Sequence, residues 1–86
     1  MATVFIPPLL RPLVAEPTVV LPGRTVREII RALDERYPGV AALLVEDDDI
    51  APGIAISIND QLSQRGLFEP VAEDSEVHIL PALAGG

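Results

Sequence analysis

The chain of 86 residues is long enough for one domain with a thin core, so we expect no deep active-site cleft. Its net charge of −7, from thirteen acidic residues against six arginines and no lysine, argues against nucleic acid as a partner and favours a basic protein surface. Cysteine is absent, which excludes disulfides and zinc–thiolate sites, and no apolar run suits a membrane span or signal peptide, so we expect a cytoplasmic protein.

Two strands are predicted at the start of the chain. Apolar side chains alternate over residues 2–7, with Phe5 pointing away from the core. The prolines that follow cannot donate ladder hydrogen bonds, so they predict an irregular, rigid link around Arg11. A second strand is predicted over residues 18–21, with Val20 outward, before the turn signal Pro22-Gly23.

One main helix is predicted next. Thr25 and Glu28 match a capping box, in which the threonine hydroxyl accepts from the amide three residues on and the glutamate reaches back to the cap amide. Apolar residues then recur along one helical face as far as Tyr37, and Pro38-Gly39 ends the helix. One further short turn is predicted over residues 40–45.

The acidic run Glu46-Asp47-Asp48-Asp49 follows that turn. It lacks the glycine and the distal glutamate of a helix–loop–helix calcium loop. We therefore interpret it as a solvated loop.

Two more strands are predicted in the second half of the chain. Alternating isoleucines indicate a strand over residues 54–58, which ends at the turn-forming pair Asn59-Asp60. Residues 61–71 are less regular and predict a short edge strand near Leu62 or a single turn near Leu67-Phe68. The last strand covers residues 76–80, with His78 outward; we interpret this lone histidine as a surface residue rather than a ligand or base.

The inward positions of these elements predict the core. They are Val4, Ile6, Val19, Leu21, Val26, Ile29, Ile30, Leu33, Ile54, Ile56, Ile58, Val77 and Ile79.

The predicted order is two strands, one helix and then two or three strands, which is the order of a β-grasp. In this α+β fold a mixed sheet of four or five strands packs on one main helix. Because two hairpins flank one crossover, the first and last strands can pair in parallel at the sheet centre. We assign residues 1–80 to this domain and residues 81–86 to a flexible tail.

A partner-binding patch is predicted on the sheet face away from the helix. If the strands run second, first, last, third, then outward Val20, Phe5, Leu80 and Ser57 lie in one row, and a soluble domain seldom leaves such an apolar row exposed without a use. Asp74 and Glu76 would steer the patch toward a basic rim. Stray surface hydrophobics, or cover by the proline-rich link, are the alternatives.

Residues 81–86 form a run of small residues that ends on two glycines. Glycine lacks a Cβ, so such a tail can thread a tunnel too narrow for side chains. A carboxylate must be activated before it reacts, as an acyl phosphate or acyl adenylate, and the carbonyl of Gly86 would be minimally hindered. The chain has no lysine, so it carries no ε-amine that could capture an activated Gly86. A general preference for arginine over lysine also explains the absence of lysine. An ordinary frayed terminus is the alternative reading of the tail.

The stretch from Val77 to Gly86 resembles the C-terminal signature of the ubiquitin-like sulfur carriers, the group that holds the small subunit of molybdopterin synthase and the thiamine-biosynthesis carrier. Within that group the opening Ile6-Pro7-Pro8-Leu9-Leu10-Arg11-Pro12, the turn Ile58-Asn59-Asp60 and the lead Leu80-Pro81-Ala82 are most similar to the actinobacterial carrier for cysteine biosynthesis.

The resemblance implies a carrier that is a co-substrate and not an enzyme. A partner of the ubiquitin-activating type would use ATP to adenylate Gly86, and a sulfur donor would then leave a thiocarboxylate there. The tail would enter the partner's active site through Gly85, Ala84, Leu83, Ala82 and Pro81. The carrier would bind no cofactor itself.

The resemblance also implies the recipients. In the cysteine branch the sulfur passes to a serine derivative on a pyridoxal-phosphate-dependent synthase, and a metalloprotease frees the product. The alternatives are the small subunit of molybdopterin synthase, inserting its tail into the large subunit, and a carrier for another metabolite. A ubiquitin-like protein modifier and a plain interaction domain are alternatives of another class.

Overall fold

The computed structural model describes residues 1–82, and its elements follow the predicted order. They are β1 (Ala2–Phe5), the 3-10 helix η1 (Pro8–Leu10), β2 (Thr18–Leu21), α1 (Val26–Arg36), α2 (Val40–Leu44), β3 (Val45–Glu46), β4 (Asp49–Ile50), β5 (Ile54–Ile58), β6 (Gln61–Leu62), the 3-10 helix η2 (Gly66–Phe68) and β7 (Glu76–Pro81).

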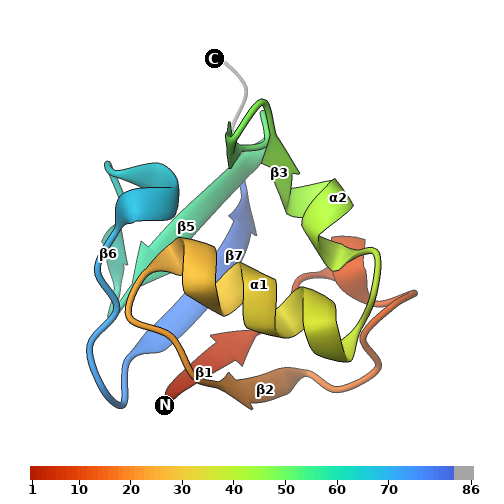
Figure 1. The fold of residues 1–86 in the computed structure, drawn as a ribbon, viewed down its shortest axis with the longest axis horizontal. Helices are drawn as coiled ribbons and strands as arrows, with labels where there is room; N and C mark the ends of the chain where they lie inside the picture. The colour runs from red at the N-terminus through yellow and green to blue at the C-terminus, as the bar shows by residue number, and fades with distance from the viewer. Residues whose placement is uncertain (83–86) are drawn as a thin grey trace.

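Five strands form the main sheet in the order β2-β1-β7-β5-β6. β1 and β7 run parallel at its centre, and the other pairs are antiparallel. Figure 1 shows α1 crossing one face of this sheet, with α2 and β3 beyond its C-terminal end. The predicted β-grasp, with its parallel central pair, is confirmed. Among the helices of residues 1–82, none combines the length and apolarity needed to cross a bilayer.

The capping box begins α1, with one difference from the prediction. The Glu28 amide donates to Thr25 Oγ1 at 3.2 Å, as expected. The Glu28 carboxylate, however, accepts from the amide of Arg24 at 2.9 Å, one residue before the cap. Of the predicted apolar stripe, Val26, Ile29, Ile30 and Leu33 are buried and pack toward the sheet, whereas Tyr37 is the C-cap residue and only partly buried.

The core contains most of the predicted residues, but Ile54 and Ile58 are only partly buried because they lie where β5 meets short neighbouring elements. The prediction missed buried side chains outside regular strands and the main helix. These are Leu10, Val14, Val40, Leu44, Leu67 and Val71. Leu10 and Val14 show that the proline-rich link is part of the core: its last turn is fixed by a hydrogen bond from the Val14 amide to the Leu10 carbonyl at 2.8 Å.

The acidic run is a tight hairpin and not a loop without regular structure, so the prediction of a solvated loop is correct only in its exposure to solvent. β3 pairs with β4 through Val45–Ile50 and Glu46–Asp49. Asp47 and Asp48 have φ of 53° and 60°, the left-handed geometry that a two-residue hairpin turn requires and that aspartate tolerates. The acidic side chains are nevertheless exposed.

The prediction for residues 61–71 offered an edge strand or a single turn. Both form, as β6 and η2.

Tyr37 ties the end of α1 to the loop before β2. Its hydroxyl donates to Glu16 Oε2 at 2.8 Å, which raises the pKa of the Tyr37 phenol and lowers the pKa of the Glu16 carboxyl. Folding therefore favours neutral tyrosine and charged glutamate. The contribution to stability is present between about pH 5 and pH 10, and it is lost as pH rises through the folded pKa of Tyr37 or falls through that of Glu16.

Because Tyr37 is the only tyrosine, an absorbance titration reports on it alone. We expect its midpoint to lie above the usual tyrosine value of about 10 and to fall toward that value in Glu16→Gln. Equal midpoints in the two proteins would show that the Glu16 carboxylate does not raise the pKa of Tyr37 in solution.

Candidate functional site

The root of the predicted tail is part of the sheet. We predicted a boundary after Leu80, but β7 continues through Pro81, which pairs with Ile54, and the Ala82 amide donates to the Gly53 carbonyl at 2.8 Å. Proline is tolerated in this strand because its nitrogen faces the β1 side, where pairing has already ended at Phe5. Pro81 and Ala82 are therefore held in place, while Leu83, Ala84, Gly85 and Gly86 lie outside the described residues.

An apolar groove of about 300 Å³ lies beside this tail root. Leu80, Pro81, Gly53 and Ile54 form one side of it, and the proline-rich link contributes the other through Pro7, Pro8 and Leu9. No charged side chain lines it, and Leu9 is 47% exposed. The groove could not be predicted from the sequence beyond the local signal of its clustered prolines, because it joins segments that are distant in the chain.

The predicted row of four outward residues is wrong, because the register differs from the one assumed. Val20 lies opposite Thr3, while Phe5 lies opposite His78. On the next strand His78 lies opposite Ser57, and Leu80 lies opposite Ala55. Phe5, Ser57 and Leu80 thus gather around His78 at the tail end of the sheet, and Val20 lies apart from them.

These residues also differ in exposure. Val20 is 52% exposed, Phe5 and Leu80 are half-buried, and Ser57 is only 8% exposed. Ser57 is covered because it lies between His78 on β7 and Leu62 on β6 in the same row. The patch that remains is Phe5, His78 and Leu80.

His78 is on the outward face, as predicted, but it is stacked and not free at the surface. Its ring lies parallel to that of Phe5, with 4.1 Å between centroids and 5° between planes. Its Nε2 is 3.9 Å from a carboxylate oxygen of Glu76. This stack gives the patch a flat, rigid aromatic centre.

The two predicted steering residues lie at different distances from the tail root. Asp74 is in the turn before β7, at the far end of the strand, whereas a carboxylate oxygen of Glu76 is 3.9 Å from His78 Nε2 in the patch.

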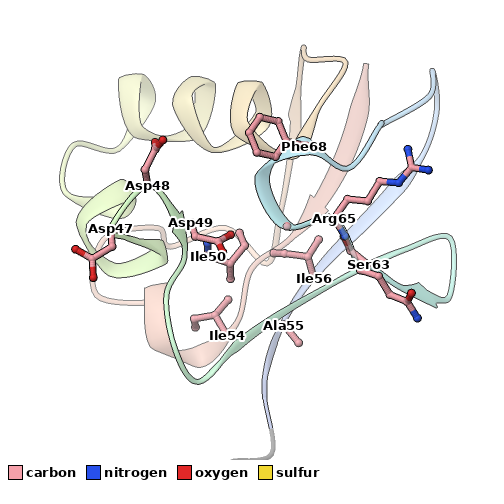
Figure 2. Close-up of a pocket in the computed structure, with 12 residues that line it drawn as sticks. Asp47, Asp48, Asp49, Ile50, Ile54, Ala55, Ile56, Ser63, Arg65 and Phe68 are labelled. Carbon is pink, nitrogen blue, oxygen red and sulfur yellow. The ribbon is translucent and has the colours of Figure 1, made fainter.

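The turn Ala51–Gly53, which follows the β3–β4 hairpin, does reach the tail root, because the Gly53 carbonyl accepts the Ala82 amide. The hairpin tip lies elsewhere: Asp48 accepts from Arg27 of α1, and Figure 2 shows Asp47 and Asp48 toward the helices.

No catalytic arrangement emerges from the described part of the chain. Within residues 1–82, no three histidine, aspartate or glutamate side chains gather closely enough to hold a metal ion. What the site offers is a tail root fixed to the sheet at Pro81 and Ala82 and an apolar groove beside it.

Comparison with known proteins shows what the whole chain is similar to. The ThiS family profile matches residues 6–86. The chain is 35% identical over 92 aligned residues to the sulfur carrier protein CysO of Mycobacterium tuberculosis, covering 98% of this chain and 97% of that one. It is 28% identical over 64 residues to small archaeal modifier protein 3 of Haloferax volcanii, covering 72% and 70%.

A solved structure matches over the full length. The crystal structure of the Amycolatopsis orientalis BexX/CysO complex includes a chain that superposes with a TM-score of 0.91 and 36% identity, covering 100% of both chains.

Proposed function

Since the chain belongs to the ThiS family of ubiquitin-like sulfur carriers, we propose that its Gly86 carboxylate carries sulfur as a thiocarboxylate. The observation that supports this most is the tail root. β7 delivers residues 83–86 from a hydrogen-bonded sheet end, beside an apolar groove that a partner can grip.

The proposed chemistry is carried out on the partner. A carboxylate oxygen of Gly86 attacks the α-phosphorus of ATP, and pyrophosphate leaves. Bisulfide then attacks the acyl carbon, the bond to the AMP oxygen breaks, and AMP leaves with that electron pair. The chain acts as co-substrate: it supplies the carboxylate and the docking surface, and it carries no lysine whose amine could capture the acyl adenylate.

We propose the cysteine pathway as the recipient of the sulfur, because two of the matches over the full chain are to proteins named CysO. The partner that activates Gly86 would be an adenylating enzyme of the ubiquitin-activating type. The partner that receives the sulfur would be a pyridoxal-phosphate-dependent synthase, and a metalloprotease would release the product.

A protein-modifier role is the second candidate, favoured by the match to an archaeal modifier protein. Incubation with an adenylating enzyme, ATP, sulfide and a lysine-rich acceptor protein separates the two. A carrier exchanges one oxygen for sulfur, a modifier forms heavier conjugates with the acceptor, and a plain interaction domain does neither. We expect the exchange.

Partner docking should depend on the outward patch. Leu80→Arg together with Phe5→Arg places two cations on a half-buried apolar surface beside the tail root, so the double variant should fold but load sulfur at least about tenfold more slowly. The matched control is Leu62→Arg, at a 67% exposed position on the edge strand β6. Loading of a folded double variant at the rate of the control would remove the patch from the partner interface.

A further inference from the structure

A second hollow, of about 580 Å³, lies on the other side of Ile54 from the apolar groove. It is bounded by the β3–β4 hairpin, the first half of β5 and the segment from Ser63 to Phe68 (Figure 2). Ile50, Ile54 and Ile56 lie at its centre and form an apolar floor.

One border of this hollow is an open sheet edge. β6 pairs with β5 only at Ser57 and Ile58, and beyond them the Ser63 amide donates to the Ile56 carbonyl at 2.8 Å. In residues 1–82, no strand pairs with this side of β5 at Ile54, although the Ile54 amide already donates to the Ala51 carbonyl at 3.1 Å and Ala55 pairs with Leu80 on the other side. The Ile54 carbonyl and the Ile56 amide are the backbone groups to which an extended segment of another protein can add alongside β5.

The walls of the hollow suit a cation that also has apolar surface. Phe68 is 72% exposed, the highest value among the large hydrophobic side chains of the described chain, and its ring stands over the hollow (Figure 2). Asp47, Asp48 and Asp49 line the hairpin side, and the guanidinium of Arg65 on the opposite side points away from the floor in Figure 2.

The same corner already holds one guanidinium of the chain itself. Arg27 donates to Asp48 Oδ1 at 3.0 Å, and its guanidinium carbon lies 5.8 Å from the centroid of the Phe68 ring. A carboxylate and an aromatic face are thus arranged here as arginine requires.

Asp49 is the carboxylate nearest the floor. A Cβ at Gly66 would lie 2.7 Å from its Oδ1, so the carboxylate is close to the η2 backbone, and that oxygen accepts the Ile50 amide at 2.8 Å. Within residues 1–82 it forms no ion pair. An arginine entering the hollow would place its aliphatic stem on the isoleucines and its guanidinium between Asp49 and Phe68.

We propose that this hollow binds an extended segment of a partner protein that adds to the β5 edge and inserts one arginine side chain. Arginine is preferred to lysine because its planar guanidinium can bind a carboxylate through two hydrogen bonds and stack on an aromatic ring. Because Ile54 pairs with Pro81, the segment would lie one strand away from the tail root. The inference goes beyond the sulfur chemistry and holds whether or not Gly86 is thiocarboxylated.

The test is a titration of the full ¹⁵N-labelled chain with the blocked tripeptide Ac-Thr-Arg-Thr-NH₂, followed by amide chemical shifts. A matched peptide carries norleucine in place of arginine. We expect the arginine peptide to shift the amides of Asp49, Ile56 and Gly66 with a Kd on the order of millimolar, as a few contacts at an exposed site allow. The norleucine peptide should bind at least about threefold more weakly.

Two variants test whether the carboxylate and the aromatic ring of the hollow contribute to binding of the arginine peptide. Asp49→Asn retains the acceptor for the Ile50 amide but removes the charge, and Phe68→Ala removes an exposed ring, so both should fold and both should weaken arginine-peptide binding about threefold or more. Leu62→Ala, outside the hollow, should change nothing. Absence of shifts, shifts that map elsewhere, equal binding of the two peptides, or unchanged binding by folded Asp49→Asn would each overturn the proposal.

Discussion

A chain that lacks Gly86 is expected to fold normally and to gain no sulfur from ATP, sulfide and the activating enzyme. The buried apolar residues of the described chain fall between Ala2 and Ile79, so the fold does not depend on residue 86. Deletion shortens the tail by one extended residue, so the terminal carboxylate lies about 3.4 Å closer to the tail root than in the parent chain. A misplacement of that size at a reacting carbonyl is enough to stop acyl transfer.

The matched variant carries one serine after Gly86, which keeps Gly86 at its original distance from the tail root and converts its carboxylate into an amide. Both variants should keep the denaturant midpoint of the parent, and both should fail to exchange oxygen for sulfur. Sulfur loading of the deletion variant at the parent rate would show that the reactive carboxylate is not on residue 86.

The largest loss of stability is expected from Leu33→Ala. Leu33 is fully buried on the core face of α1, so its truncation loses transfer free energy and leaves a cavity, at a cost of about 2–5 kcal/mol. That is a large share of the roughly 5–15 kcal/mol that small domains have. Leu43→Ala, on the neighbouring α2 at a position 40% exposed, is the control and should cost far less. Equal denaturant midpoints for the two variants would mean that the face of α1 is misassigned.

The strands and the helix could be predicted because the apolar residues of each element recur at the spacing typical of that element. Residues 18–21 alternate between exposed and buried as predicted, and the buried stripe of α1 follows the spacing of Val26, Ile29, Ile30 and Leu33. The capping signal at Thr25 fixed the start of the helix for the same local reason. Local patterns therefore sufficed for the architecture.

The errors come from features that hydrophobic periodicity does not encode. The row through Val20 was wrong because register depends on where each turn places its strand, and a shift of the pairing moves every cross-strand neighbour. Leu10 and Val14 were missed because buried residues in an irregular link have no period. The hairpin at Asp47-Asp48 was missed because aspartate, not glycine, occupies its left-handed positions.

The candidate site was predicted in part. The sequence indicated the tail and placed Phe5 and Leu80 on the outward face, which the structure confirms. It did not indicate that Pro81 and Ala82 belong to the sheet, nor that Pro7, Pro8 and Leu9 complete a groove beside them, since both features require contacts between β7 and distant segments.

The sulfur-carrier role is tested most directly by fragmentation mass spectrometry of the intact chain after incubation with the adenylating enzyme, ATP and sulfide. We predict that one oxygen is exchanged for sulfur and that the exchange is confined to fragments that contain Gly86. An unchanged mass in the presence of an active partner, or sulfur found on fragments that lack Gly86, would contradict the proposal.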